Sequence, residues 1–389
     1  MEQSSEFQCV ATAREQQWLY QLGDEGIVYS QAQNRIAGLD AAGLLAYWAF
    51  DAGASLDDLQ AFSTASQRSQ AAELTLDTIF ALSRGRFPKA QDHEERGDWP
   101  ALDFSQSATV EVHGIPMLVE CPQEALRMLC SDCFKSCPLS NQPARFHLRI
   151  VRAGTSWAIS ANDREIFAPV RDEQIGLGLL HAVRSLLYDE APYDVAFHAA
   201  MIADSRHGIM LCAPREFGKS TLSAYLSAHG FDLVSDEPAM LCLDTSSISP
   251  VEMPISLKEG TWRFLEDEWP QLAGAPIHVR SDGRRIRLLH LPHDRAAHAP
   301  RQLTHIVFPK YSPASPASLE ALSPIRRFTL LNEGGMLLGK QLTKDKFEHF
   351  LRLICATPAF VAHYRSLQEA AGMIESIVNA SSLNAPAGR

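Results

Sequence analysis

One stretch of the chain has the residue types and spacing of a phosphate-binding site. The segment from His207 to Glu237 reads HGIMLCAPREFGKSTLSAYLSAHGFDLVSDE. Gly218, Lys219 and Ser220 fill the last three positions of the pattern G-x-x-x-x-G-K-[ST], in which backbone N–H groups and the positive end of the following helix face phosphate oxygens. The lysine pairs with the β- and γ-phosphates and the hydroxyl binds Mg²⁺. The segment therefore predicts a site for ATP, or another nucleoside triphosphate, together with Mg²⁺.

The loop departs from the pattern at its first position, where Ala213 replaces glycine. Glycine there lets the strand turn without a Cβ penalty, and alanine can stand in if its φ stays negative. A chance GKST at an ordinary helix start is the alternative, and Arg215 and Glu216 are also explained as solvated loop residues. The predicted nucleotide-binding residues are Ala213, Pro214, Arg215, Glu216, Phe217, Gly218, Lys219, Ser220 and Thr221.

Two acids form the C-terminal end of the next predicted strand, at residues 231–237. In open α/β sheets ligands collect beyond the carboxyl ends of strands, so Asp236 and Glu237 are expected near the same crevice as Lys219. Phosphoryl transfer needs a metal-organising acid and, for a hydroxyl acceptor, a base. We predict Asp236 as the base or a ligand of Mg²⁺-bound water, and a metal site of Ser220, Asp236 and Glu237. A solvated acidic turn is the alternative.

Other polar residues are weaker candidates. His198 lies in the strand before the loop strand and could bond the acid or the γ-phosphate, although a lone strand histidine is more often packed. Arg284 and Arg285 belong to a basic stretch, HVRSDGRRIRLLHL at residues 278–291. We predict this stretch to be a lid that clamps phosphates or acidic peptide residues, and a solvated charged loop is the alternative.

Three cysteines have a spacing that can hold metal. Cys130, Cys133 and Cys137 read C-x-x-C-x-x-x-C, and thiolates so spaced can bind zinc or an iron–sulfur cluster. Positions i, i+3 and i+7 also lie along one face of a helix, and buried cysteine is common. The sequence leaves both interpretations open.

Composition narrows the class of protein. The 389 residues are 46% hydrophobic and 21% charged, with a net charge of −11, which is ordinary for a folded protein and argues against binding of nucleic acid. No apolar run approaches the ~20 residues that span a bilayer, and the N-terminus lacks the features of a secretion signal. Eight cysteines are too sparse for a disulfide scaffold. We expect a cytoplasmic protein without a membrane partner.

Periodicity places these residues on alternating elements. Strands are predicted at 17–30 as a pair, at 108–121 as a hairpin, as two strands within 145–168, and at 195–203, 208–213, 231–237 and 303–311. Helices are predicted at 39–53, from Ser55, at 66–82, 122–137, 172–190, 220–230 and 359–380. We expect domains at 1–90, 101–192 and 193–380, a linker at 91–100 and a disordered tail at 381–389.

The segment from His198 to Glu237 resembles the catalytic domain of HPr kinase/phosphorylase and its relatives, and a weaker likeness extends through MPISLKEG to the C-terminus. The resemblance implies an α/β fold, a P-loop, PEP-carboxykinase-like mixed sheet with flanking helices. It also implies that Asp236 is the general base or acid, assisted by His198, and that Lys258 contacts phosphate or substrate. Ala213 and Glu237 depart from the family pattern, and no counterpart of the signature that recognises HPr is seen.

The segment WLYQLGDEGIVYSQAQNRIAGLDAAGLLAYWAFDAGASLDDL is similar to the PqqD family of small α+β winged-helix-like domains, which capture leader peptides of ribosomally made natural products. The resemblance implies that a peptide adds to a strand edge offered by residues between Trp18 and Tyr29. A small dimerisation or scaffold domain is the alternative.

Together these features predict a serine/threonine kinase of the HPr-kinase type, acting on a precursor peptide that the N-terminal domain docks. Other maturation enzymes are further candidate partners, and a homo-oligomer is left open. The alternatives are a non-catalytic, nucleotide-gated peptide-binding partner and a phosphorylase that removes phosphate.

Overall fold

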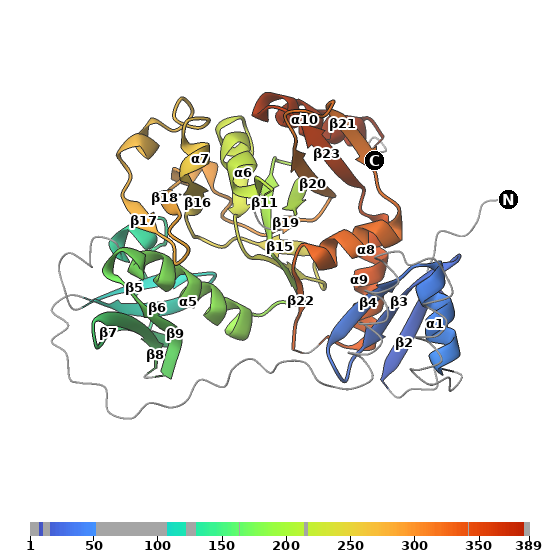
Figure 1. Cartoon of the computed structure of the whole chain (residues 1–389), viewed down its shortest axis with the longest axis horizontal. Coiled ribbons are helices and arrows are strands. Elements are labelled where there is room, and N and C mark those ends of the chain that lie inside the picture. Colours follow the sequence, from blue (N-terminus) through green and yellow to red (C-terminus); the bar gives the residue numbers. More distant parts are fainter. Residues whose placement is uncertain are drawn as a thin grey trace. The chain divides into compact units, whose positions relative to one another are not determined.

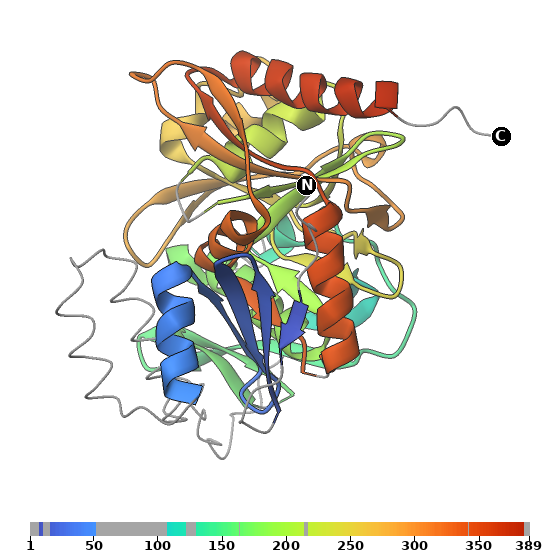
Figure 2. The same cartoon turned by 90° about the vertical axis from the view of Figure 1, so that its right-hand side faces the viewer.

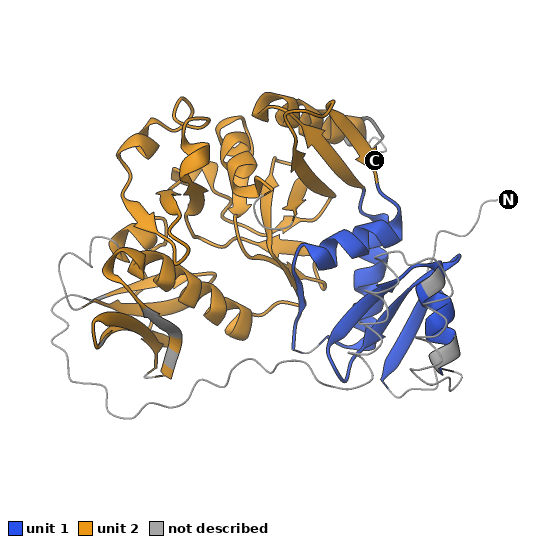
Figure 3. Cartoon of the chain, in the orientation of Figure 1, with its two compact units in different colours: residues 1–91, 322–358 blue, residues 92–321, 359–389 orange. Residues whose placement is uncertain are grey.

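The computed structural model describes residues 8–10, 16–51, 107–121, 130–162, 164–213, 217–340 and 342–384. The fold is mixed α/β with several sheets (Figure 1). Two compact units divide the chain: residues 1–91 with 322–358, and residues 92–321 with 359–389 (Figure 3). Among the described helices, none is long and apolar enough to cross a membrane.

The first unit contains a four-stranded antiparallel sheet in the order β1 (Gln8–Val10), β2 (Gln17–Leu22), β3 (Glu25–Ser30) and β4 (Arg35–Leu39). Helix α1 (Ala41–Asp51) follows. The predicted strand pair and the first predicted helix are confirmed. The helices expected from Ser55 and at 66–82, and the linker, lie outside the described residues.

Two helices from the far end of the sequence complete this unit. They are α8 (Pro324–Glu333) and α9 (Lys344–Ala356), with β22 (Met336–Leu338) between them. Successive side chains of a strand face opposite ways: Leu19 packs with α1, while the rings of Tyr29 and Phe347, on α9, stack with centroids 4.2 Å apart. Helices α1 and α9 therefore cover opposite faces of the sheet (Figure 2).

This division differs from the ranges expected from motifs, which placed residues 322–358 inside a segment spanning 193–380. The inserted helices are fastened to the first sheet by long-range polar contacts as well as by apolar packing. Tyr29 donates from its hydroxyl to the carbonyl of Leu342 at 2.6 Å, and Asn34 donates to the carbonyl of Leu338 at 3.0 Å. The first unit is thus built from two segments far apart in sequence.

The second unit begins with a five-stranded sheet in chain order: β5 (Ser107–Val112), β6 (Ile115–Glu120), β7 (Phe146–Ala153), β8 (Ser156–Ala161) and β9 (Arg164–Val170). Helix α5 (Ile175–Glu190) packs on β8 and β9. The hairpin at 108–121 and the helix at 172–190 are confirmed. The prediction of two strands within 145–168 is wrong, because the chain turns at Asn162, whose φ is +50°, a conformation that asparagine tolerates.

The central sheet has six strands in the order β13 (Asp232–Ser235), β11 (Ala199–Ala203), β12 (Gly208–Cys212), β20 (His305–Tyr311), β23 (Ala359–Tyr364) and β21 (Ser318–Ala321). Strands β12, β20 and β23 run parallel. Helix α6 (Lys219–Ala228) packs on β11, β12 and β13, and α10 (Leu367–Asn384) packs on β23 and on α6. The predicted phosphate loop therefore connects a buried strand to the helix that covers it.

Shorter strands surround this core. Strand β10 (Val195–Phe197) pairs with β14 (Ala239–Cys242), which pairs with β15 (Ser247–Ser249), and β15 pairs with β19 (Arg301–Gln302). A separate three-stranded sheet has the order β16 (Ile255–Lys258), β18 (Arg285–Leu289) and β17 (Ile277–Val279), and α7 (Glu259–Trp262) follows β16. Short 3₁₀ helices span Asp172–Gln174, Pro270–Gly274 and His293–Arg295.

Three expectations about elements are corrected. Residues 359–364, expected to begin the last helix, form β23, and α10 begins at Leu367, where Ser366 accepts a hydrogen bond from the N–H of Glu369 at 3.2 Å. The expected disordered tail overlaps this helix, which continues to Asn384. The predicted strand at 195–203 is two strands, because β10 and β11 pair with different partners on either side of His198.

Candidate phosphate-binding site

The loop between β12 and α6 has a backbone that requires glycine at its last position. Gly218 takes φ +86° and precedes the first residue of α6, a conformation that side chains with a Cβ rarely adopt. A Cβ added there would lie 3.2 Å from the hydroxyl of Tyr364. Pro214, Arg215 and Glu216 lie outside the described residues, whereas Ala213 is buried at the end of β12.

Lys219 points back along the loop. Its side chain is buried, and Nζ donates to the carbonyl oxygen of Ala213 at 2.6 Å. Burial lowers the pKa of Lys219, the nearby Cys212, Glu237 and Asp236 oppose this, and the charge of Lys258 adds to it. The ammonium of Lys219 is therefore held at the first residue of the loop, and the positive charge of Lys258 is close enough to lower its pKa.

Asp236 lies just beyond β13, and its carboxylate is bonded by groups from α6 and β16. Its carboxylate accepts hydrogen bonds from the hydroxyls of Ser220 at 3.1 Å and Ser223 at 3.3 Å, and from the N–H of Ser256 at 3.4 Å. Only 6% of the residue is exposed. Burial raises the pKa of Asp236 above its usual range, more than the charge of Arg184 lowers it. The structure thus brings Ser220 and Asp236, two of the three predicted metal ligands, into direct contact.

Glu237 has the opposite electrostatic character. Its Oε1 lies 2.7 Å from Nδ1 of His198. Burial alone would raise the pKa of Glu237, but the bond to His198 and the charges of Arg184 and Lys219 lower it to about 2. Two neighbouring carboxyl groups whose pKa values are pushed apart are a common arrangement in catalytic sites. Here Asp236 is the acid suited to exchange a proton, and Glu237 is suited to stay ionised.

The three predicted substrate residues separate into two groups. Lys258 ends β16 and lies two residues after Ser256, whose N–H bonds the carboxylate of Asp236. Arg285 instead pairs with Glu259, and Arg284 lies 3.5 Å from Asp282. The partners found for both arginines are in α7 and in the turn between β17 and β18.

The stretch expected to be a lid forms the β17–β18 hairpin. His278, on β17, is fully buried, and its Nε2 lies 2.8 Å from the carboxylate of Asp132. This contact packs one strand of the hairpin into the second unit, whereas residues 281–284 of the turn are exposed. A role for the hairpin as a lid stays a prediction.

Two residues near the acids were not anticipated. Ser223 lies one helical turn after Ser220 and bonds the same carboxylate, Asp236, and the i,i+3 spacing was available in the sequence. Arg184, on α5, lowers the pKa of both Asp236 and Glu237. Its signal was a cation within the apolar stretch LLHAVRSLL of a helix, where charge is unusual without a partner.

The cysteine cluster does not gather its sulfur atoms around one point. Cys133 donates to the carbonyl of Gly176 at 3.2 Å and Cys137 to that of Glu252 at 2.7 Å, while Cys130 lies 3.8 Å from Cys121. Burial raises the pKa of the Cys137 thiol to about 12, which disfavours the thiolate that a metal requires.

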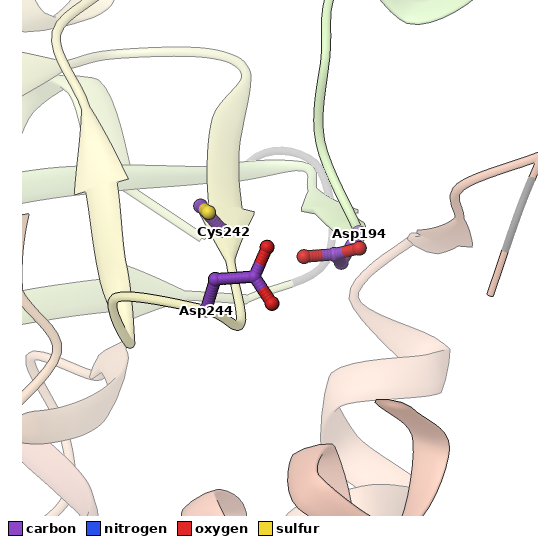
Figure 4. Close-up of side chains that lie close together, drawn as sticks. All are labelled: Asp194, Cys242 and Asp244. Carbon is purple, nitrogen blue, oxygen red and sulfur yellow. The ribbon is translucent and has the colours of Figure 1, made fainter. Parts of the chain in front are cut away.

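A different group of potential metal ligands lies elsewhere in the second unit. Within the described residues, only Asp194, Cys242 and Asp244 bring three donor atoms within 4.8 Å of one another. Figure 4 shows them gathered near the turn that follows β14. One carboxylate oxygen of Asp194 is already used, accepting from the N–H of Leu243 at 2.8 Å. This group is separate from the predicted metal site.

No protein-family model matches the chain, and no curated protein matches it. Among solved structures, the chain is similar to the Hpr(Ser) kinase/phosphatase from Coxiella burnetii, with 12% sequence identity and a TM-score of 0.25 over 48% of this chain and 96% of that chain. A similarity of this size carries no functional argument, so the function has to be inferred from the geometry of the site.

Proposed function

We propose that the protein transfers the γ-phosphoryl group of ATP to a serine or threonine hydroxyl of a peptide. The observation that carries this proposal is the position of Asp236. Its buried carboxylate is bonded to Ser220 and Ser223 on the first turns of the helix that follows the phosphate loop. A group able to take a proton is thus fixed beside the loop that would hold the phosphates.

The residues present fit ATP and Mg²⁺. The left-handed Gly218 opens the N-terminus of α6, whose free N–H groups favour phosphate, and the ammonium of Lys219 is fixed at the loop. Ser220, Asp236 and Glu237 would hold Mg²⁺. When bound, ATP with Mg²⁺ supplies the transferable phosphoryl group and neutralises its charge.

The chain's own residues then have separate roles. Asp236 accepts the proton of the acceptor hydroxyl, since burial has raised its pKa above the usual range of a carboxyl group. His198 orients Glu237 through the 2.7 Å contact between its Nδ1 and Oε1 of the carboxylate. Lys258, whose charge is felt at Lys219, is the candidate contact to phosphate or substrate.

We further propose that the first unit docks the peptide, by addition of a strand to its sheet. The residues between Trp18 and Tyr29 cannot offer the edge, because β2 pairs with β1 and β3, and β3 pairs with β2 and β4. The outer strands β1 and β4 are the positions that fit. Docking would raise the effective concentration of the acceptor at the phosphate site.

A transfer assay with Lys219→Met tests the proposal. Methionine keeps the length and apolar character of this buried side chain, so we expect a folded variant that has lost nucleotide binding and transfer. Purified protein would be incubated with ATP, Mg²⁺ and peptides encoded beside its gene, and phosphopeptide detected by mass spectrometry.

The outcome separates the proposed function from its rivals. Phosphopeptide formed by the wild type and not by Lys219→Met supports the kinase. Peptide binding that persists without nucleotide, with no transfer to any of these peptides, would favour a binding module. Release of inorganic phosphate from a synthetic phosphopeptide, without net phosphorylation, would favour the phosphorylase direction.

A further inference from the structure

Arg184 is a charged residue in the mostly buried part of helix α5. It belongs to α5, where its neighbours Val183 and Leu187 and, one turn earlier, Leu180 are buried. Its Nε atom is buried and has no hydrogen-bond partner. Because a buried N–H without an acceptor costs free energy, an orphaned guanidinium nitrogen in this position calls for an explanation.

The two carboxyl groups on which the charge of Arg184 acts already have other hydrogen-bond partners. The Arg184 charge acts on both Asp236 and Glu237, yet Asp236 bonds the hydroxyls of α6 and Glu237 bonds His198. The guanidinium therefore stands close to the acids without a hydrogen bond to either. An ordinary charge-balancing arginine would form a direct, often bidentate, pair with one of them.

A second orphaned donor lies beside Asp236, on β16. The hydroxyl of Ser256 is buried without a partner, while its N–H reaches Asp236 at 3.4 Å. On β16, Ser256 and Lys258 alternate with the buried Ile255 and Leu257, so they share one face. The region around Asp236 thus contains two unsatisfied donors and two ammonium groups, which is a composition suited to a multiply charged oxyanion.

We infer that Arg184 is a catalytic residue of this site, which donates from Nε to an oxygen of the phosphoryl group in transfer. The inference rests on the proposed function. In that step the bond from the γ-phosphorus to the bridging oxygen of ADP breaks, and a bond to the peptide hydroxyl oxygen forms. The hydroxyl proton passes to Asp236, and the electron pair of the broken bond leaves with ADP. Arg184 stabilises the charge on the non-bridging oxygens.

The test is binding of a transition-state mimic, which does not depend on turnover. Affinity for ADP with Mg²⁺ and aluminium fluoride would be measured by calorimetry beside affinity for ADP with Mg²⁺ alone. For Arg184→Gln we expect the first to fall by about 10²- to 10³-fold, the usual effect of losing one such donor, and the second to stay unchanged. Arg184→Lys, which keeps the charge but not the Nε–H, should resemble Arg184→Gln.

Arg145→Gln is the matched control. Arg145 is exposed and pairs at 2.7 Å with Glu190, the last residue of the same helix, so its loss should leave both affinities unchanged. Guanidinium ion added to Arg184→Gly should restore part of the mimic's affinity, which a purely structural role for the arginine would not produce.

The result that would overturn the inference is equal loss of affinity for ADP and for the mimic, or no loss of either, in folded Arg184→Gln and Arg184→Lys. If the wild type binds the mimic and Lys219→Met does not, such a result removes only the role of Arg184. If the wild type itself binds neither nucleotide nor mimic, the proposed function fails, and the inference fails with it.

Discussion

Replacing Asp236 by asparagine should separate catalysis from stability. The amide has the shape of the carboxylate but cannot accept a proton at neutral pH. Transfer is therefore expected to fall by about 10²- to 10⁴-fold, the contribution of a positioned general base. Affinity for nucleotide measured without Mg²⁺ should change little, because the loop and Lys219 are untouched.

The hydrogen bonds around Asp236 indicate that the variant folds. The amide oxygen can keep the position of Oδ2, which accepts from Ser220 at 3.1 Å and from the N–H of Ser256 at 3.4 Å. The amide nitrogen then faces Ser223, whose hydroxyl has another acceptor, the carbonyl of Ser220 at 3.2 Å. That hydroxyl can turn to accept from the amide, so the unfolding free energy should change by no more than about 1 kcal/mol.

The raised pKa of Asp236 also predicts in which direction stability and transfer change with pH. Because burial raises the pKa of Asp236, the folded protein holds this proton more tightly than the unfolded chain. Its ionisation therefore makes stability fall as pH rises from the unfolded pKa through the folded pKa. Asp236→Asn should abolish this decline, and wild-type transfer should rise with pH over the same range.

Parallel assays of transfer and of thermal unfolding across pH check both statements. Ser227→Ala is the control, since Ser227 is a buried serine on the same helix that bonds the carbonyl of Ser223 rather than Asp236. Asparagine at position 236 with full transfer would refute the role of base. A collapse of stability together with activity would refute the account of its hydrogen bonds.

Three further changes have defined outcomes. Gly218→Ala should weaken nucleotide binding roughly tenfold, because the left-handed φ of residue 218 costs alanine about 1–2 kcal/mol. Adding Tyr364→Phe, which removes the hydroxyl nearest the new Cβ, should not restore binding, and calorimetry can show both results. Glu237→Gln should remove the stability that the ionised Glu237 contributes above its unfolded pKa, which the wild type loses as pH falls through the folded pKa of about 2. The difference between the ordinary pKa of 4.5 and the folded pKa of about 2 corresponds to about 3 kcal/mol. Urea melts at several pH values test this. Phe347→Ala should cost the first unit about 3–5 kcal/mol in the same melts, whereas Leu45→Ala, at an exposed position, should cost almost nothing.

The elements with a clear period could be predicted from sequence. The strand pair at 17–30, the hairpin at 108–121 and the strand, loop and helix around Gly218 each carry the pattern of the structure they form. The residues of the candidate site also follow from local rules, because a motif, a strand end and a helix start place Lys219 and Asp236 near each other.

The misjudged elements depend on tertiary pairing. Residues 359–364 are mostly apolar and precede a helix, and what makes them a strand is the parallel partner β20, distant in sequence. Likewise nothing local indicates that α8 and α9 belong with the N-terminal sheet. Their apolar faces fit any core, and the partner is fixed by contacts such as that of Phe347 with Tyr29.

Arg184 was missed for the same reason. A cation in an apolar helix shows only that some partner is needed, and the helix lies between strands that the sequence cannot place around Asp236. The peptide edge was misjudged because the short strand β1 covers β2, and a three-residue strand leaves almost no periodic signal.

The first turns of α6 connect the predicted phosphate loop, which follows β12, with the two acids that follow β13. Strand β13, which carries the acids, is separated in the sheet from the loop strand β12 by β11. The acids therefore reach the loop only where β13 has ended, and Ser220 and Ser223 close the remaining gap by bonding Asp236 from α6. If Ser220 is the hydroxyl that binds Mg²⁺, it must exchange its bond to Asp236 for the metal. Losing a hydrogen bond that lowers its pKa would raise the pKa of Asp236, whereas the nearby positive charge of the metal would lower it. The base strength of Asp236 would thus be set by occupancy of the loop rather than by the carboxyl group alone.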